Sequence, residues 1–210
     1  MTKDLLKAVV FYILSIYFSF LLVDIFNIME FIKIIPQEQK LNYGLGLYNV
    51  ILNTLFLAIQ TKIEDNKLKI EMIFYKKEDE PDIVHNPTVN FVNDLGEINI
   101  QVLVKGKTKR LKDKYIKIPK EQFVTMQKST SRDNKISRID NEGNYIIELE
   151  NLYLSKDKKY IEMKIESRIS FLSIEEHFES KLRPVLIGDN TIMDRLMIKF
   201  THNDFNIKSK

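Results

Sequence analysis

Basic side chains concentrate in one stretch of the sequence, and they are the residues with the clearest capacity to bind a ligand. Residues 105–138 hold twelve lysines and arginines against three acidic residues, a net +9, whereas the whole chain carries +3. Clustered cations raise the local concentration of anions and gain from releasing their counterions. We therefore expect the start of this stretch to bind an anionic ligand, through Lys105, Lys107, Lys109, Arg110, Lys112, Lys114, Tyr115 and Lys117.

Two anionic partners fit this cluster, and a third interpretation needs no partner. Anionic lipid headgroups attract lysines that lie close to a membrane. A nucleotide or oligonucleotide second messenger would need arginines for its phosphates and a ring to stack a base, for which Tyr115 and Phe123 are available. Lysine outnumbers arginine nine to three here, which favours diffuse attraction over tight phosphate binding. The third interpretation is a solvated face that keeps the domain soluble. Genomic nucleic acid is not an expected partner.

Catalytic and metal-binding patterns are sparse. The tripeptide at residues 106–108 (GKT) resembles the end of a phosphate-binding loop, but Gln101 stands where that motif has its first glycine. His85, His177 and His202 are scattered without ligand spacing, and the chain has no cysteine. We therefore expect no enzyme, no metal and no cofactor. The alternative is an active site hidden inside a barrel.

A second polar pattern lies within otherwise apolar sequence. Four amide side chains recur at intervals of 7, 4 and 7 residues and so share one helical face: Asn42, Asn49, Asn53 and Gln60. A weaker row in the preceding apolar segment comprises Tyr12, Ser15 and Ser19. Amides and hydroxyls in hydrocarbon need a partner or water. They either hold two helices together within one chain, or form an oligomer interface or a water-filled pore between copies.

Two apolar segments must position these polar rows. Residues 5–26 are apolar except for one charged residue near each end, and residues 41–61 contain no charge. As helices they would rise roughly 33 Å and 31 Å, enough to cross a hydrocarbon core of about 30 Å. We expect a transmembrane helical hairpin in residues 1–61 and a soluble domain in residues 62–210. A secretory signal peptide is the alternative for the first segment, but no small-residue cleavage site follows it.

The distribution of lysines predicts the orientation. Lys3 and Lys7 precede the first apolar segment and five lysines follow the second within residues 62–77, whereas the loop between them holds Lys33 and Lys40. By the positive-inside rule, both termini and the soluble domain face the cytoplasm.

From residue 66 onward the apolar spacing changes from helical to alternating, as in strands with one buried face. About eight strands are expected, which indicates a mainly-β domain folded as a sandwich or a barrel. They cover residues 68–74, 89–92, 98–104, 115–118, 145–154, 160–171, 185–187 and 196–200. Hairpin turns are expected at residues 105–106 and 155–157, and a mobile polar loop over residues 127–144. Ser173 and Glu176 have the spacing of a capping box, so a short helix is expected to start there.

A membrane hairpin followed by a small β-rich domain resembles the two-transmembrane effectors of bacterial CBASS anti-phage systems. In that family the β-domain is a small barrel that binds a cyclic nucleotide, and binding assembles copies that breach the inner membrane. The resemblance covers the whole chain, rests on the order and size of its elements, and carries over no individual residue. It implies a pore-forming, homo-oligomeric defence effector in the bacterial inner membrane, activated by a cyclic or linear oligonucleotide. The alternative is a membrane-anchored, non-enzymatic interaction module that binds a protein partner or anionic lipid.

Overall fold

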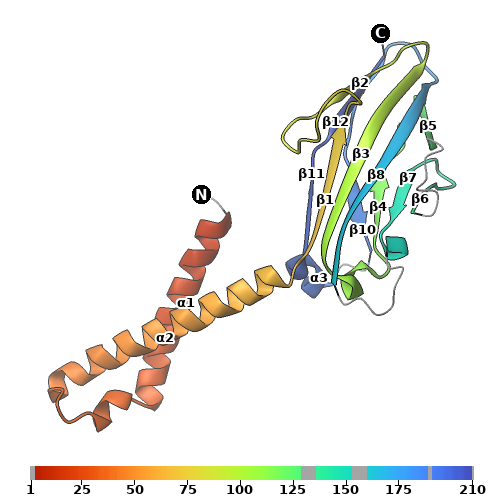
Figure 1. Ribbon diagram of the computed structural model, residues 1–210. Coiled ribbons are helices and arrows are strands. Elements are labelled where there is room, and N and C mark those ends of the chain that lie inside the picture. Colours follow the sequence, from red (N-terminus) through yellow and green to blue (C-terminus); the bar gives the residue numbers. More distant parts are fainter. Residues whose placement is uncertain (1–2, 129–135, 153–159, 189–190, 210) are drawn as a thin grey trace. The chain divides into compact units, whose positions relative to one another are not determined.

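The computed structural model describes residues 3–128, 136–152, 160–188 and 191–209 (Figure 1). The chain divides into two compact units, Met1–Asp65 and Asn66–Lys210. The first unit is helical and the second is mainly β. The predicted combination of an N-terminal helical region with a mainly-β domain is therefore confirmed.

Two long helices make up the first unit, joined through a 3₁₀ helix: α1 (Lys3–Ile25), η1 (Ile28–Phe31) and α2 (Gln37–Asp65). By length and composition, both long helices are apolar enough to cross a membrane, over Ala8–Ile25 and Gln37–Asp65. Most of their large apolar side chains are exposed, because the helices bury only a narrow seam between them. Apolar exposure of this extent marks a surface that contacts lipid or protein.

A five-stranded sheet forms one layer of the β unit. Its order is β11-β1-β3-β8-β5, with bounds Ile198–His202, Leu68–Tyr75, Leu95–Lys107, Tyr160–Ser173 and Val124–Lys128. All neighbours are antiparallel except β1 and β11, which are parallel. The central pair is long, since β3 and β8 stay in register from Leu95 opposite Leu172 to Lys107 opposite Tyr160.

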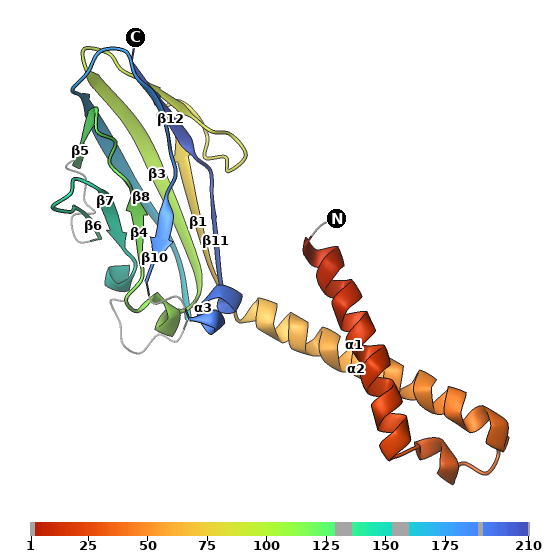
Figure 2. The same ribbon diagram turned by 180° about the vertical axis from the view of Figure 1, so that it is seen from behind.

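Two smaller sheets form the opposite layer. One has the order β10-β4-β7-β6, with bounds Val185–Ile187, Tyr115–Ile118, Tyr145–Glu148 and Ser137–Ile139. The other has the order β2-β12-β9, with bounds Thr88–Asn90, Phe205–Lys208 and Glu179–Leu182. Figure 2 shows β4, β10 and β12 lying over the five-stranded sheet. The remaining elements are η2 (Thr108–Leu111), η3 (Glu150–Leu152) and α3 (Ile192–Met197).

The core lies between the layers and follows from the alternation of the strands. In β1, Leu68, Ile70, Met72 and Phe74 are almost fully buried, while Lys69 between them is exposed. The phenylalanine rings of the two layers meet, with centroids 4.5 Å apart for Phe74 and Phe205. Burial of such side chains contributes about 1.5–3 kcal/mol each relative to exposure.

The barrel alternative is wrong, because the sheets are open. Among the described residues, β11 and β5 form opposite edges of the five-stranded sheet and do not pair with each other. The chain changes sheet at a bend instead: β11 pairs with β1, and after Asn203 and Asp204 the chain continues as β12 beside β2 and β9. Such bends build a two-layer sandwich, whereas a barrel needs pairing between its first and last strands.

Several local predictions are also wrong. Residues 105–106 do not form a turn, since β3 runs on to Lys107 with Gly106 at a φ of 144° packed against Leu68. The helix predicted to start at Ser173 is absent, because the chain from Glu179 pairs with β12 as β9. The amide of Ser173 donates instead to the carbonyl of Asp94. A short helix occurs later in the chain instead, as α3, which is capped by Thr191. The strands β5, β6, β9 and β12 were not predicted, and β6 lies in the predicted loop at residues 127–144. The turn predicted at residues 155–157 lies outside the described residues.

Candidate functional site

The eight residues predicted to bind an anion do not form one site. The structure distributes them over three places: the outer face of the five-stranded sheet (Lys105), the end of the sandwich around η2 (Lys107, Lys109, Arg110, Lys112), and β4 with its approach (Lys114, Tyr115, Lys117). The charge of residues 105–138 therefore acts on more than one face of the domain.

The two lysines of β4 and its approach both pair with carboxylates of the same chain, one in a buried position and one at the surface. The side chain of Lys114 is only 4% exposed, and its Nζ lies 3.1 Å from Oδ2 of Asp194 in α3. Burial opposes ionisation of Asp194, but the hydrogen bond and charge of Lys114, together with hydrogen bonds from Thr191, hold the pKa of that carboxyl below its usual value. Lys117 Nζ lies 3.3 Å from Glu142 Oε2. Lys114 therefore fastens α3 to the second layer instead of facing a ligand.

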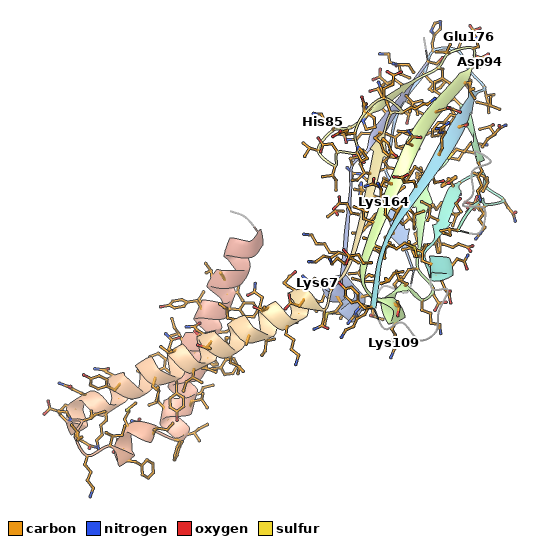
Figure 3. All side chains as sticks on the ribbon, in the orientation of Figure 1. Lys67, His85, Asp94, Lys109, Lys164 and Glu176 are labelled. Carbon is orange, nitrogen blue, oxygen red and sulfur yellow. The ribbon has the colours of Figure 1, made fainter. Side chains whose placement is uncertain are left out.

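A groove of about 540 Å³ crosses the outer face of the five-stranded sheet at Lys105. It spans β11, β1, β3 and β8, and we call it the lysine groove after its lining, which includes Lys69, Glu71, Leu103, Lys105, Lys164 and Lys199. Figure 3 shows Lys164 on the outer face of β8. These side chains point outward because they alternate with the core positions of the same strands.

Strand register places three lysines side by side across this groove. Lys199 of β11 is opposite Lys69 of β1, and Lys69 is opposite Lys105 of β3. Neighbouring strands lie about 4.8 Å apart, so like charges directly opposite each other destabilise the sheet. Glu162 Oε1 lies 2.8 Å from Lys105 Nζ and raises the pKa of that lysine. Within the described part of the chain, Lys69 and Lys199 have no acidic partner. An anion seated between them would relieve the repulsion.

Three lysines of the groove, Lys69, Lys164 and Lys199, were not among the predicted ligand-binding residues. They lie far from residues 105–138 in the sequence and reach the groove only through strand pairing. The available signal was their outward position in alternating segments. That signal does not give strand order or register, and both are needed to bring the three together.

The helical hairpin brings together part of the predicted polar rows. Ser15 and Ser19 are buried against α2. Ser15 Oγ donates to Asn49 Oδ1 at 2.7 Å, and Asn53 Nδ2 donates to the same oxygen at 3.1 Å. The other predicted members lie at the margins, since Asn42 is exposed, Tyr12 is exposed and Gln60 is half-buried. Within this unit, one hydrogen bond of the polar rows joins the two helices, the bond from Ser15 to Asn49. The α2 row lies at the border between the helix contact and the exposed surface.

Close packing fixes the end of the hairpin that lies next to the connection between the helices. Gly44 is buried, and a Cβ atom there would lie 2.6 Å from Asn27 Oδ1. Tyr48 donates its hydroxyl proton to the carbonyl of Phe26 at 2.6 Å. A Cβ at Gly46 would meet nothing within 4 Å. Gly44 therefore serves helix contact within the chain, whereas Gly46 faces outward.

The connection between the helices holds a charge pair. Lys40 is buried, and its Nζ donates to the carbonyl of Glu30 at 3.2 Å and lies 3.5 Å from that residue's carboxylate. Glu30 thus compensates one of the two lysines of the connection, which leaves Lys33 as its exposed cation.

A polar corner forms where β11 ends. Asn203 is 3% exposed, and its side chain bonds to both ends of the β1–β2 connection. Its Oδ1 accepts a hydrogen bond from the amide of Phe74 at 2.7 Å. Its Nδ2 donates to the carbonyls of Phe74 at 2.9 Å and His85 at 2.6 Å. Asp204 is buried beside Lys181 and Arg183. Burial opposes its ionisation, but hydrogen bonds from these two cations and their charges lower its pKa.

Histidine and carboxylate side chains of the described residues do not group as a metal site: no set of three or more is placed to hold an ion. His85 Nδ1 lies 2.5 Å from Asp82 Oδ2 in the exposed β1–β2 connection. A hydrogen bond from the Val84 amide and one from His85 lower the pKa of Asp82. His202 lies beside Asp204, with Nδ1 3.3 Å from its Oδ1. Both histidines thus have local carboxylate partners.

Comparison with known proteins adds little to this geometry. No protein-family model matches the sequence, and no curated protein matches it. Among solved structures, the chain is similar to the cohesin CaCohA2 from Clostridium acetobutylicum, with a TM-score of 0.37 and 11% identity over 70% of this chain and 92% of that one. It is also similar to the seventh ScaB type I cohesin from Pseudobacteroides cellulosolvens, with a TM-score of 0.34 and 10% identity over 69% and 93%. Scores of this size do not define a common fold, and nothing about ligands or partners follows from them.

Proposed function

We propose that this protein is a membrane-anchored receptor whose β-sandwich binds a phosphate-bearing ligand in the lysine groove. The observation that carries the proposal is the row of Lys199, Lys69 and Lys105 in register across three strands. Like charges held side by side on a sheet lower its stability. A bound anion turns that repulsion into attraction, and charge-assisted hydrogen bonds to phosphate are stronger than neutral ones.

The ligand we propose is a cyclic or linear oligonucleotide second messenger, as the CBASS resemblance implies. The groove volume of about 540 Å³ falls in the range of pockets for ligands of that size. Neither arginine nor an aromatic ring lines the groove. Recognition would therefore act through the phosphates and the apolar floor at Leu103 more than through base stacking.

The output we propose is assembly in a bacterial inner membrane, with breach of the bilayer as a defence against phage. The exposed apolar surfaces of α1 and α2 support insertion as a hairpin. The lysine asymmetry, five lysines after the second apolar segment against Lys33 and Lys40 in the loop, supports an orientation with both termini in the cytoplasm. Ligand drives assembly only if it binds the assembled state better than the single chain.

Ligand binding is tested by thermal-shift and titration measurements on the full chain with cyclic di- and trinucleotides and with the linear oligonucleotides of the same length. Replacing Lys69 and Lys199 together by glutamine removes two charged contacts, each about 1.5 kcal/mol or more, so affinity should fall at least roughly 100-fold. The matched control replaces the exposed Lys76 and Lys77 by glutamine, which removes equal charge outside the groove. Equal losses in both variants would mean that only net charge matters. No stabilisation of the parent by any of these anions would refute the receptor and favour the interaction module.

The membrane output is tested by dye entry into cells that express the protein with its activating nucleotide. Replacing Asn49 and Asn53 by leucine should abolish dye entry while ligand binding persists. Asn42→Leu distinguishes a role of the row in holding α1 and α2 together from a role in contacts with other copies or water. Asn42 is exposed and makes no hydrogen bond with α1 among the described residues. If Asn42→Leu also blocks dye entry, the row contacts other copies or water. If neither variant blocks it, the row plays no part in the breach.

A further inference from the structure

One end of the sandwich gathers the start of β1, the end of β3 and the helix α3. Leu68 of β1 is opposite Ile198, the residue that follows α3. Gly106 of β3 packs against Lys67 and Leu68, since a Cβ there would lie 2.8 Å from the Lys67 carbonyl oxygen. Figure 3 shows Lys67 and Lys109 at this end of the domain and Asp94 and Glu176 at the opposite end.

Exposed apolar and basic side chains share this end. Ile192 and Leu196 of α3 are 79% and 56% exposed, and their spacing of four residues puts them on one face of the helix. Lys107, Lys109 and Lys112 are exposed around η2, and among the described residues none of the three pairs with a carboxylate. The buried pair of Lys114 and Asp194 fastens α3 to the chain that follows η2, so both groups belong to one rigid surface.

The chain enters the β unit at this same end. Only Asn66 and Lys67 separate the last residue of α2 from the first residue of β1. The three Cα–Cα steps from Asp65 to Leu68 span at most about 11 Å. If α2 crosses the bilayer, the polypeptide therefore delivers this end of the sandwich to the membrane surface, whatever the orientation of the domain about the link.

We propose that this end is a membrane-docking surface: Ile192 and Leu196 insert between lipid headgroups, while Lys107, Lys109 and Lys112 bind the phosphates of anionic phospholipids. Apolar side chains flanked by lysines are the composition of surfaces that lie in the headgroup region. The inference rests on the proposed membrane hairpin, and it is independent of what the lysine groove binds.

Tryptophan fluorescence tests the docking directly, because the chain contains no tryptophan. Ile192→Trp, or Leu196→Trp as a second reporter, is placed in the full chain and reconstituted into nanodiscs. The discs contain bromine-labelled phosphatidylcholine, alone or mixed with phosphatidylglycerol. We expect blue-shifted emission and quenching that increase with phosphatidylglycerol. Ile174→Trp, at an exposed site after β8 near the opposite end, is the matched control and should stay unquenched.

Charge variants and a membrane reporter complete the test. Lys109→Glu with Lys112→Glu should lower the docked-to-free ratio of the Ile192→Trp protein by at least roughly 30-fold in anionic discs, and Lys76→Glu with Lys77→Glu should not. Quenching of Ile192→Trp no greater than that of Ile174→Trp, or equal in neutral and anionic discs, overturns the docking surface. Ile51→Trp reports on α2: if it is quenched while Ile192→Trp is not, the hairpin stands without docking. If Ile51→Trp is not quenched, the membrane hairpin and the docking surface both fail.

Discussion

Replacing Asn203 by alanine should destabilise the β unit more than any other single change at its polar corner. The side chain accepts one hydrogen bond from the Phe74 amide and donates to the carbonyls of Phe74 and His85, with a longer contact to that of Asp82 at 3.3 Å. An amide nitrogen has two hydrogens, so we count three full bonds. At about 1 kcal/mol net for each, the loss is roughly 3 kcal/mol. The buried amide of Phe74 would also be left unpaired.

Thermal unfolding of the detergent-solubilised full chain measures this loss. For a domain of this size, roughly 3 kcal/mol corresponds to a fall in Tm of about 6–12 °C. Asn206→Ala is the matched control, because Asn206 lies three residues on in β12 and contributes its backbone amide, donated to the Pro87 carbonyl at 2.9 Å. Its truncation should change Tm by less than about 2 °C.

Limited proteolysis locates the effect. Trypsin should cut after the exposed Lys76 and Lys77 faster in Asn203→Ala than in Asn206→Ala, because the lost bonds tie both ends of the β1–β2 connection. If the two variants unfold at the same temperature and are cut at the same rate, Asn203 does not fasten this connection and the reasoning is refuted.

Two further predictions concern the corner carboxylate and the hairpin. Because Lys181 and Arg183 lower the pKa of Asp204 in the folded state, its ionised form stabilises the fold above about pH 4, and this stabilisation is lost as pH falls further. Asp204→Asn should therefore be less stable than the parent at pH 6, with a gap that narrows toward pH 3 in pH-dependent thermal melts; a constant gap would contradict the assignment. Gly44→Val should cost roughly 1–3 kcal/mol of hairpin stability in detergent through overpacking, whereas Gly46→Val, which points into open space, should be near neutral. Equal effects at the two glycines would show that Gly44 is not a contact point.

The sequence was sufficient to predict the helices and strands that have a clear pattern of apolar residues within their own segment. The strand at residues 115–118 was predicted with its observed bounds, since Ile116 and Ile118 alternate with half-buried neighbours. The two helices were predicted from long, mostly apolar runs, and α2 proved longer because polar residues at both of its ends continue the helix. Short strands such as β9 were missed, because they are defined by pairing with a strand distant in the sequence, as Leu182 is with Phe205, which no local pattern records.

The sequence could not show which of the predicted cations share a surface, for a related reason. Charge density along residues 105–138 was real, but β3, η2 and β4 point its cations at different surroundings. The capping box at Ser173 was misleading because tertiary partners, here the Asp94 carbonyl, had already taken the amide that a helix would use. Strand order brought Lys69 and Lys199 to Lys105, and strand order is a property of the whole sheet.

The two interpretations of the polar row in α2 need not compete. Asn53 bonds to Asn49 along the same helix, and only the bond from Ser15 to Asn49 crosses between helices. Turning the row toward other copies would thus sacrifice one interhelical hydrogen bond, worth about 0.6–1.7 kcal/mol in a membrane. A ligand that binds the assembled state only about tenfold better per chain supplies 1.4 kcal/mol, which is of the same size. If copies assemble, turning the polar row toward them thus costs no more than a modest ligand preference supplies, as long as the contacts at Gly44 and Tyr48 persist.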